Sequence, residues 1–389
     1  MPSGKVVVEN LYKIFDPDPC DALAMLKQGV KKEAVLSQTG KVVGVNDVSF
    51  SVNEGEIFVL MGLSGSGKST LIRLINRLVD PSDGKIFVDG QDVAKLSAKQ
   101  LVQLRRSDMS MVFQSFALMP HRTVLDNTAF GLEIAGVARK EREQRAARVL
   151  EQVGLSTYAK KYPHQLSGGM QQRVGLARAL AVNPSLMLMD EAFSALDPLK
   201  RKEMQDVLLN LQSEQRRTIF FVSHDLEEAL RIGNRIAIME GGRLVQVGTP
   251  QEIIENPADE YVRAFFKSVD TSRYLVASDL LDTAGIPILV KGQTVGTQPA
   301  WHPWLAFVNP ERKWLGLIST DALSACGNLV QSVQAQHTAV SERTTLQDIL
   351  PQLLGKAAPL PVLDGNGSYL GVITAASALR KISQGANHA

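Results

Sequence analysis

A glycine-rich segment that directly follows a short apolar run constrains this chain more than any other feature. Residues 57–61 are apolar throughout and lie between two glycines, as expected of a strand buried on both faces. The next nine residues read GLSGSGKST and precede a run with helical spacing, residues 71–78. A strand, a glycine-rich loop and a helix in this order predict a phosphate-binding loop, because backbone N–H groups and the helix N-terminus converge on the phosphate oxygens. The predicted loop residues are Gly62, Ser64, Gly65, Ser66, Gly67, Lys68, Ser69 and Thr70.

Specific side chains in and beyond this loop suit hydrolysis of a bound phosphate. We expect Lys68 to neutralise the β- and γ-phosphates and the Ser69 hydroxyl to coordinate Mg²⁺. A second apolar run, residues 186–189, ends in Asp190 and Glu191. Asp190 would hold the Mg²⁺ shell from the carboxyl end of the sheet, and Glu191 would orient or deprotonate the attacking water as general base.

A third segment predicts a second anion site. The sequence LSGGMQQ at residues 166–172 is expected to begin a helix whose free N–H groups and serine hydroxyl form another cradle. Since one nucleotide needs only one phosphate loop from the same chain, we predict a homodimer in which this cradle faces the γ-phosphate bound by the partner's loop. The predicted residues of the second cradle are Leu166, Ser167, Gly168, Gly169, Met170 and Gln171.

The longer string LSGGMQQRVGLARAL resembles the signature motif of ATP-binding cassette (ABC) ATPases, and residues 5–266 are similar to the nucleotide-binding domain of an ABC importer. This resemblance implies ATP and Mg²⁺ as cofactors. It also implies that Gln114 is the Q-loop glutamine, which senses water and joins Ser69 and Asp190 at Mg²⁺. His224 would be the switch histidine, which contacts the γ-phosphate. The D-loop that crosses the dimer interface would consist of Ser194, Ala195, Leu196 and Asp197. Phe15 is the candidate for the ring that stacks on adenine, with Tyr12 as the alternative.

Composition restricts the class of protein. The 389 residues are 44% hydrophobic and 21% charged, as is typical of a soluble globular chain. Lys and Arg total 42 against 40 Asp and Glu, so the net charge of +2 gives no reason to expect nucleic-acid binding. No apolar run approaches the roughly 20 residues of a membrane span, and the N-terminus lacks the apolar segment of a secretory signal. Cys20 and Cys326 are the only cysteines, so we expect free thiols in a reducing cytosol.

The order of apolar runs predicts an α/β fold with two domains. Buried strands alternate with helices, which favours a largely parallel sheet. The expected strands are residues 57–61, 109–113, 186–189 and 219–222, and the expected helices include 140–153 and 169–181. We predict a P-loop ABC-type nucleotide-binding domain with a helical subdomain over residues 1–270, interrupted by a helical insertion at about 16–43. A smaller α/β domain would occupy residues 271–389.

The smaller domain contains an internal repeat. Residues 307–319 align with residues 362–374 at a shift of 55, and each copy predicts a strand, a tight turn, a second strand and a helix. This pattern resembles a tandem pair of CBS modules. CBS modules that bind adenine nucleotides typically place an Asp three positions after the Ser or Thr that follows the second strand. Here Ser319 precedes Asp321 by two positions and Thr374 is followed by Ser377, so we expect a structural or regulatory role with an unknown ligand.

Finer features resemble the ATPase subunits of glycine betaine/proline importers, the quaternary-amine uptake family. They are LYKIF at 11–15, the insertion before GVNDVSF, and MVFQSFALMPHRTVLDNTAFGLE at 111–133. The resemblance implies a homodimer beneath two integral-membrane permease subunits, supplied by a substrate-binding protein, at the cytoplasmic face of the inner membrane. Residues 114–121 would contact the permease, unless this apolar loop folds back on its own core.

Two other functions stay open from the sequence. One is an importer ATPase for another small polar solute, because substrate choice belongs to other chains. The other is a soluble ABC ATPase outside transport, which the single cassette and the lack of a heptad run disfavour.

Overall fold

The computed structural model describes residues 4–194, 196–266, 275–282, 286, 288–291, 303–321, 333–334, 339–355 and 358–387. The chain divides into two compact units, residues 1–262 and 263–389. The predicted D-loop residue Ala195, the second cysteine Cys326 and the expected domain boundary at 270–271 lie outside the described residues. Cys20 is a free, exposed thiol, as expected.

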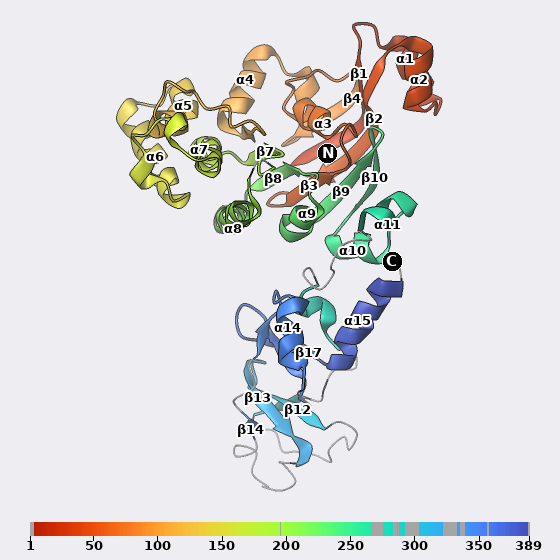
Figure 1. The fold of residues 1–389 in the computed structure, drawn as a ribbon, viewed down its shortest axis with the longest axis vertical. Coiled ribbons are helices and arrows are strands. Elements are labelled where there is room, and N and C mark those ends of the chain that lie inside the picture. Colours follow the sequence, from red (N-terminus) through yellow and green to blue (C-terminus); the bar gives the residue numbers. More distant parts are fainter. Residues whose placement is uncertain are drawn as a thin grey trace. The chain divides into compact units, whose positions relative to one another are not determined.

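The first unit contains a six-stranded and a four-stranded sheet (Figure 1). The six-stranded sheet has the order β10-β9-β3-β8-β7-β6 and is parallel except for β10, which runs antiparallel to β9. Its strands are β3 (Ile57–Met61), β6 (Met109–Val112), β7 (Leu186–Asp190), β8 (Thr218–Val222), β9 (Arg235–Glu240) and β10 (Arg243–Gly248). The antiparallel sheet has the order β2-β1-β4-β5, with β1 (Val6–Phe15), β2 (Val42–Val52), β4 (Asp83–Val88) and β5 (Gln91–Asp92). The predicted largely parallel sheet is confirmed.

Helices connect and flank these strands (Figure 1). They are α1 (Cys20–Lys27), α2 (Lys32–Thr39), α3 (Lys68–Ile75), α4 (Ala98–Ser107), α5 (Val124–Ile134), α6 (Arg139–Gln152), α7 (Gly168–Ala181), α8 (Pro198–Gln215), α9 (Leu226–Ile232), α10 (Pro250–Glu255) and α11 (Glu260–Phe266). Helices α5, α6 and α7 pack on one another as a helical subdomain. The helix expected at 71–78 was misplaced: it begins at Lys68, directly after the glycine loop, and ends before Arg77, whose φ of 52° is left-handed. None of the described helices is long and apolar enough to cross a bilayer.

An aromatic stack joins the two sheets of the first unit. Phe50 of β2 lies 5.2 Å from Phe58 of β3, and Phe58 lies 5.7 Å from Phe220 of β8, measured between ring centroids. All three rings are buried. Since each buried Phe side chain contributes about 1.5–3 kcal/mol, the stack fixes the central strands on which the site is built.

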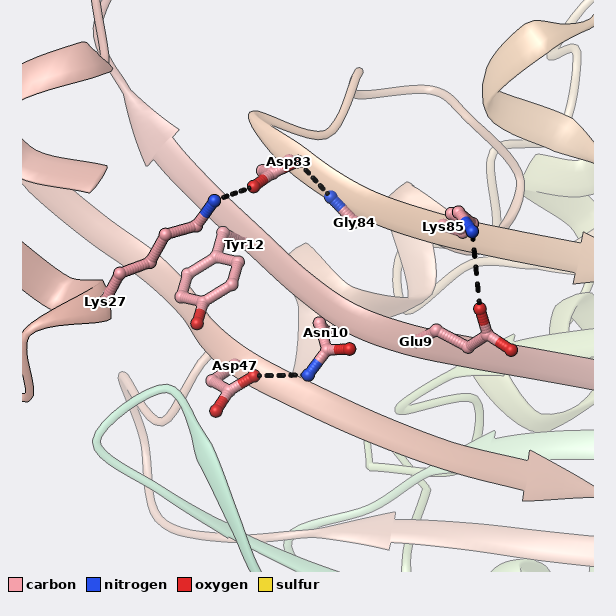
Figure 2. Close-up of a pocket in the computed structure, with 8 residues that line it drawn as sticks. All are labelled: Glu9, Asn10, Tyr12, Lys27, Asp47, Asp83, Gly84 and Lys85. Atoms are coloured by element: carbon pink, nitrogen blue, oxygen red, sulfur yellow. Dashed lines mark hydrogen bonds and ion pairs between the residues drawn. The ribbon is translucent and has the colours of Figure 1, made fainter. Parts of the chain in front are cut away.

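The insertion at 16–43 contains α1 and α2, which pack on β1 around the buried rings and methyl groups of Tyr12, Leu26 and Val35. A pocket of about 410 Å³ is lined by α1 and by strands β1, β2 and β4 (Figure 2). Three polar pairs connect the elements around it. They are Lys27–Asp83 at 2.5 Å, Asn10–Asp47 at 3.0 Å and Lys85–Glu9 at 3.9 Å (Figure 2). The Lys27–Asp83 pair connects helix α1 of the insertion to β4, whereas the other two pairs connect β1 to its neighbours β2 and β4 within the sheet.

The second unit has two small sheets of matching topology. One has the order β11-β12-β13-β14 and the other β15-β16-β17. The elements are β11 (Ile288–Val290), β12 (Trp304–Val308), β13 (Trp314–Ser319), β14 (Val333–Gln334), β15 (Val340–Ser341), α14 (Leu346–Leu353), β16 (Leu360–Leu363), β17 (Tyr369–Ile373) and α15 (Ala375–Asn387). In each sheet a strand pairs in parallel with the first strand of an antiparallel hairpin.

Contacts between the two hairpins fit the predicted internal repeat, although most of the helix predicted after residue 319 lies outside the described residues. The Trp314 N–H donates to Gly367 O at 3.3 Å, and the Tyr369 N–H donates to Arg312 O at 2.9 Å. Trp314 precedes Tyr369 by 55 positions, and Arg312 precedes Gly367 by the same number. The rings of Trp314 and Tyr369, themselves equivalent, stack with centroids 5.4 Å apart. Equivalent residues thus meet each other as across a local twofold axis, which is the arrangement that a duplication produces.

Candidate active site

Four predicted site segments meet at one edge of the six-stranded sheet. Strands β3, β8, β7 and β6 are consecutive neighbours and run parallel, so their carboxyl ends lie together. The glycine loop follows β3, and His224 follows β8 by two residues. Asp190 ends β7, with Glu191 next to it, and Gln114 follows β6. Residues far apart in the sequence therefore share one site.

Two glycines of the loop occupy positions that no other residue fits. Gly62 has a φ of +150°, and a Cβ there would lie 2.1 Å from Met239 O. Gly67 has a φ of +102°, and a Cβ there would lie 2.3 Å from Gly44 O. The loop can pass this close to the neighbouring backbone only without side chains. Both glycines are thus required by the shape of the loop itself.

The loop contains buried polar side chains that could bond to a ligand. Lys68 is buried and its Nζ donates to Gly62 O at 2.8 Å and Leu63 O at 2.9 Å. Burial lowers the pKa of Lys68, so an anion beside it would restore the stability of its charged form. The buried Ser66 Oγ has no hydrogen-bond partner among the described residues. Ser64 and Gly65 are exposed at the loop tip, whereas Thr70 is half-buried on α3.

Ser69 and Asp190 form a pair of oxygen donors suited to Mg²⁺. Ser69 Oγ donates to Asp190 Oδ1 at 3.0 Å, and Arg73 approaches the other carboxylate oxygen to 4.0 Å. Asp190 is buried, and burial raises its pKa. A hard divalent cation binds carboxylate and hydroxyl oxygens and would offset the desolvation of this carboxylate. Among the described residues no group of three or more His, Cys, Asp or Glu could hold a metal ion. Mg²⁺ bound by one or two side chains usually takes its other ligands from water and from substrate phosphates.

Glu191 is the meeting point of two other predicted residues. Gln114 Nε2 donates to Glu191 Oε2 at 3.1 Å, and His224 Nδ1 lies 3.2 Å from the same oxygen. The Glu191 backbone has a left-handed φ of 46°, which is rare for a residue with a side chain. Its N–H donates to Val222 O at 3.0 Å and its carbonyl accepts from Ser194 Oγ at 3.0 Å. The surrounding backbone thus holds this carboxylate at the end of β7, in reach of both predicted partners.

The predicted second cradle is the exposed N-terminus of α7. Ser167 is the N-cap and accepts from the Met170 N–H at 3.4 Å, while Leu166 is buried beneath it. Gly168 is exposed and Gly169 is half-buried. Gln171 Nε2 donates to Pro163 O at 3.0 Å and thereby fixes the chain that enters the helix. The N-terminus of a 14-residue helix is left facing solvent.

The D-loop lies next to this helix start in the same chain. A Cβ on Gly169 would lie 3.8 Å from Leu196 Cδ2, so the two segments are close neighbours. Asp197 is the N-cap of α8 and accepts from the Lys200 N–H at 3.0 Å. Ser194 binds the carbonyl of Glu191, as described above. The described part of the D-loop therefore lies beside the signature helix and contacts the backbone of Glu191.

The two candidate adenine-stacking rings differ sharply in exposure. Phe15 is 49% exposed, whereas Tyr12 is 6% exposed and packs in the core of the insertion. A Cβ on Gly44 would lie 2.7 Å from Phe15 Cε2 and 3.2 Å from Thr70 Cγ2, which places Phe15 beside the start of α3. An exposed ring next to the phosphate loop can stack on a base. The structure therefore favours Phe15.

Sequence reasoning missed Arg178, which connects α7 to the loop after Gln114. Its guanidinium donates to Phe116 O at 3.2 Å and to Ala117 O at 2.5 Å. Burial lowers the pKa of Arg178. Asn127, on α5, binds the same loop by accepting a hydrogen bond from the Met119 N–H at 2.8 Å. The only signal in the sequence was the position of Arg178 within LSGGMQQRVGLARAL, and its partner carbonyls are invisible there because any residue supplies a carbonyl.

In the second unit, the hydroxyls that follow β17 are used within the chain. Thr374 Oγ1 donates to Asp282 Oδ2 at 2.9 Å, and Ser377 Oγ donates to Leu280 O at 2.8 Å. Asp282 was not foreseen, because it lies 92 residues away in sequence. These contacts connect the start of α15 to the start of the unit, and Thr374 Oγ1 also accepts from the Ser377 N–H at 3.0 Å.

The fold and the site define the class of protein. A phosphate loop, a carboxylate pair at the end of a neighbouring strand and a signature helix on a helical subdomain are combined in one cassette. A family model described as ABC transporter matches residues 45–194. The chain belongs to the ABC family of transport ATPases, and it is an ATP-binding cassette.

Particular relatives narrow the comparison. ProV of Salmonella typhimurium, a glycine betaine/proline betaine transport system ATP-binding protein, is 49% identical over 381 residues, covering 95% of each chain. OpuAA of Bacillus subtilis, a glycine betaine transport ATP-binding protein, is 46% identical and covers 95% of this chain and 90% of its own. Among solved structures, the dimeric ATP-binding cassette MJ0796 with ADP and Pi matches with a TM-score of 0.54 and 30% identity, covering 63% of this chain and 98% of that chain. The predicted family and the cassette fold are confirmed.

Proposed function

We propose that this chain is the ATP-hydrolysing subunit of an ABC importer for glycine betaine, proline, choline or a similar compatible solute. The convergence of Gln114 and His224 on the carboxylate of Glu191, beside a phosphate loop, is the observation that carries the hydrolytic part. The similarity to the betaine transport proteins over nearly the whole chain supports the solute class.

The residues of one chain divide the work around the phosphates. Lys68, Ser66 and the loop N–H groups bind the β- and γ-phosphate oxygens, and Phe15 stacks on the adenine. Ser69 and Asp190 would hold Mg²⁺, with Gln114 beside them, and Mg²⁺ would neutralise charge on the phosphates. Glu191 accepts a proton from the attacking water. His224, at 3.2 Å from Glu191, orients that carboxylate and contacts the γ-phosphate.

We further propose that two copies of the chain enclose ATP. The exposed residues Ser167 and Gly168 at the start of α7 would contact the γ-phosphate bound by the partner's loop, with the D-loop alongside. The helix dipole and free N–H groups favour an anion at this position. The dimeric state of the matched cassette MJ0796 supports this arrangement.

The work of ATP binding would pass to two integral-membrane permease subunits, with the chain on the cytoplasmic face of the inner membrane. Residues 114–121 are the proposed contact. Gln114, Ala117 and Pro120 are exposed there, while Arg178 and Asn127 fix the backbone of the loop from inside. A rigid, partly apolar loop suits contact with a permease helix. The duplicated second unit, which resembles a CBS pair, would regulate this ATPase.

Reconstitution tests the proposal directly. The chain is combined with its permease and substrate-binding protein in vesicles, and uptake of radiolabelled glycine betaine is followed with ATP on the chain's side. We expect uptake that requires ATP and Mg²⁺ and that glycine betaine stimulates ATP turnover. Uptake of a different solute with no response to betaine would retain the ATPase but reject the proposed solute. Absence of ATP turnover in the assembled complex would reject both.

A further inference from the structure

One ion pair lies between the D-loop and the loop that carries His224. Arg201, on the first turn of α8, forms an ion pair through Nη1 with Asp225 Oδ2, and its Nη2 donates to Leu196 O in the D-loop at 3.3 Å. The side chains are 26% and 28% exposed, so both are largely removed from water. Arg201 therefore binds the D-loop backbone and the residue next to His224 with one planar group.

Asp225 is itself rigidly held. Its Oδ1 accepts from the Glu228 N–H at 3.1 Å as the N-cap of α9, which leaves Oδ2 for Arg201. Its own N–H donates to Ser223 Oγ at 3.0 Å, and Ser223 Oγ donates to the buried Glu228 at 2.5 Å. These bonds connect Arg201, through Asp225, to the backbone next to His224 and to the first turn of α9.

The D-loop has a second attachment within the same chain. Ser194 binds the carbonyl of Glu191, at the other end of the loop from Arg201. Glu191 and His224 are 3.2 Å apart, so the two attachments lead to the two members of one contacting pair. A shift of the D-loop thus changes the relative positions of the proposed base and its orienting histidine.

We propose that Arg201 and Asp225 are positioning residues for ATP hydrolysis. Their ion pair fixes the spacing between the D-loop and His224, so that contact of a second copy with the D-loop is transmitted to His224 and Glu191 of this copy. This inference rests on the proposed function, since it assigns the pair a part in turnover within the ATP-bound dimer. Neither residue touches nucleotide in this assignment.

A second ion pair between the same helices provides a matched control. Arg231 of α9 and Asp206 of α8 form an ion pair at 2.6 Å, with 28% and 54% of the side chains exposed. This pair braces α8 against α9 just as Arg201–Asp225 does. The Arg231 guanidinium donates to Lys202 O, Gln205 Oε1 and Asp206 Oδ1. None of these bonds is made to the D-loop or to Asp225.

The test is a double-mutant cycle on the full-length chain, measuring kcat and KM for ATP hydrolysis. We expect Arg201→Gln and Asp225→Asn each to lower kcat about 10- to 100-fold, because small displacements of catalytic groups cost this much. KM and the affinity for a fluorescent ATP analogue should stay within about twofold of wild type, since the phosphate contacts are intact. Asn preserves the N-cap of α9, so Asp225→Asn remains informative even if Arg201→Gln folds poorly.

The double variant should lose no more activity than either single variant, because the two residues act through one contact. In the control cycle, Arg231→Gln and Asp206→Asn should leave kcat within about twofold of wild type. Combined with Glu191→Gln, Arg201→Gln should still allow the ATP-dependent dimer to form, which separates mispositioning from a failure of assembly.

Unchanged kcat in folded Arg201→Gln or Asp225→Asn protein would overturn the inference while leaving the proposed ATPase function intact. Multiplicative losses in the double variant, or an equal loss of kcat in the control cycle, would also overturn it. A wild-type chain without ATP turnover would instead reject the proposed function.

Discussion

A strand followed by a helix occurs in both units, but among the described junctions β3–α3 of the first unit is open to a ligand and β17–α15 of the second is bonded within the chain. Between β3 and α3 lie residues 62–67, a glycine-rich loop whose Ser66 hydroxyl has no partner among the described residues. Between β17 and α15 lies only Thr374, whose hydroxyl is bonded to Asp282. The two junctions differ in length and glycine content, and the glycine-rich residues 62–67 let several N–H groups converge on one anion before the helix begins.

The comparison extends to the charged groups. In the first unit Lys68 and Asp190 are buried with pKa values displaced by desolvation, as is common where a ligand is to be bound. In the second unit the rings of Trp314 and Tyr369 stack at the centre. Burial raises the pKa of the Tyr369 phenol, so this group stays neutral at neutral pH. The first unit thus has buried ionisable groups near its strand ends, whereas the repeated hairpins of the second unit pack against each other through aromatic rings.

The largest effect is expected for Glu191, the proposed general base of the first unit. Glu191→Gln should lower ATP hydrolysis by on the order of 10²–10⁴-fold while ATP binding persists, because Gln accepts no proton from water. The ATP-bound dimer should accumulate and be seen by size-exclusion chromatography with light scattering. Near-normal turnover in this variant would remove Glu191 from the role of base.

Next in size is a change at the centre of the second unit. Tyr369→Ala should reduce the free energy of unfolding of residues 263–389 by about 3 kcal/mol, since a buried ring and its stack on Trp314 are lost. All three tryptophans lie in this unit, so tryptophan fluorescence during urea unfolding reports on it selectively. The neighbouring Leu370→Ala, at a 43% exposed side chain, should cost well under about 1 kcal/mol. Equal losses for the two variants would contradict the packing described for Tyr369.

A smaller effect on the same residue, Tyr369, is expected at alkaline pH, where its side chain can ionise. Burial raises the pKa of Tyr369 to about 12, compared with about 10 in an unfolded chain. The neutral phenol is therefore favoured in the folded unit, so its contribution is fully present below pH 10 and is lost as the pH rises through 12. Relative to Tyr369→Phe, wild type should lose about 2 kcal/mol across this window. Parallel stability curves for the two proteins from pH 9 to 12 would contradict the raised pKa.

The smallest effect concerns the nucleotide base. Phe15→Ala should weaken ATP binding by about 1–3 kcal/mol, the range for stacking of a base on an aromatic ring. The matched variant Tyr12→Leu removes the aromatic ring but keeps an apolar side chain in the core. It should leave the affinity unchanged, because the Tyr12 ring is buried in the insertion. Fluorescence titration with a nucleotide analogue measures both. The opposite ranking would assign the stacking role to Tyr12.

Much of the first unit could be predicted from the sequence because its signals are local. The strand 57–61 is apolar throughout, and the glycines at 62 and 67 are demanded by the backbone path of the loop. The bounds of α3 were wrong by three residues, since helical spacing alone cannot show that the helix starts at Lys68 to direct its N–H groups at the loop. Local patterns fix the kind of element better than its ends.

The contacts that organise the site could not be predicted in the same way. Arg178 binds the carbonyls of Phe116 and Ala117, and Asp282 accepts from Thr374, yet neither pair shares a motif or a short spacing. Backbone carbonyls have no sequence signature, and ion pairs such as Arg201–Asp225 depend on how two helices cross. Such contacts become visible only when the chain has folded.

The sequence by itself determined which groups we propose to act on ATP, because a glycine loop, a carboxylate pair and a signature segment each require particular residue types at short range. Tertiary structure alone decided how they act together. The parallel order β3-β8-β7-β6 brings Gln114, Glu191 and His224 to one edge, and the packing of α8 and α9 connects the D-loop to the switch histidine. The physical reason is that bonding distances between residues dozens of positions apart are set by strand order and helix packing.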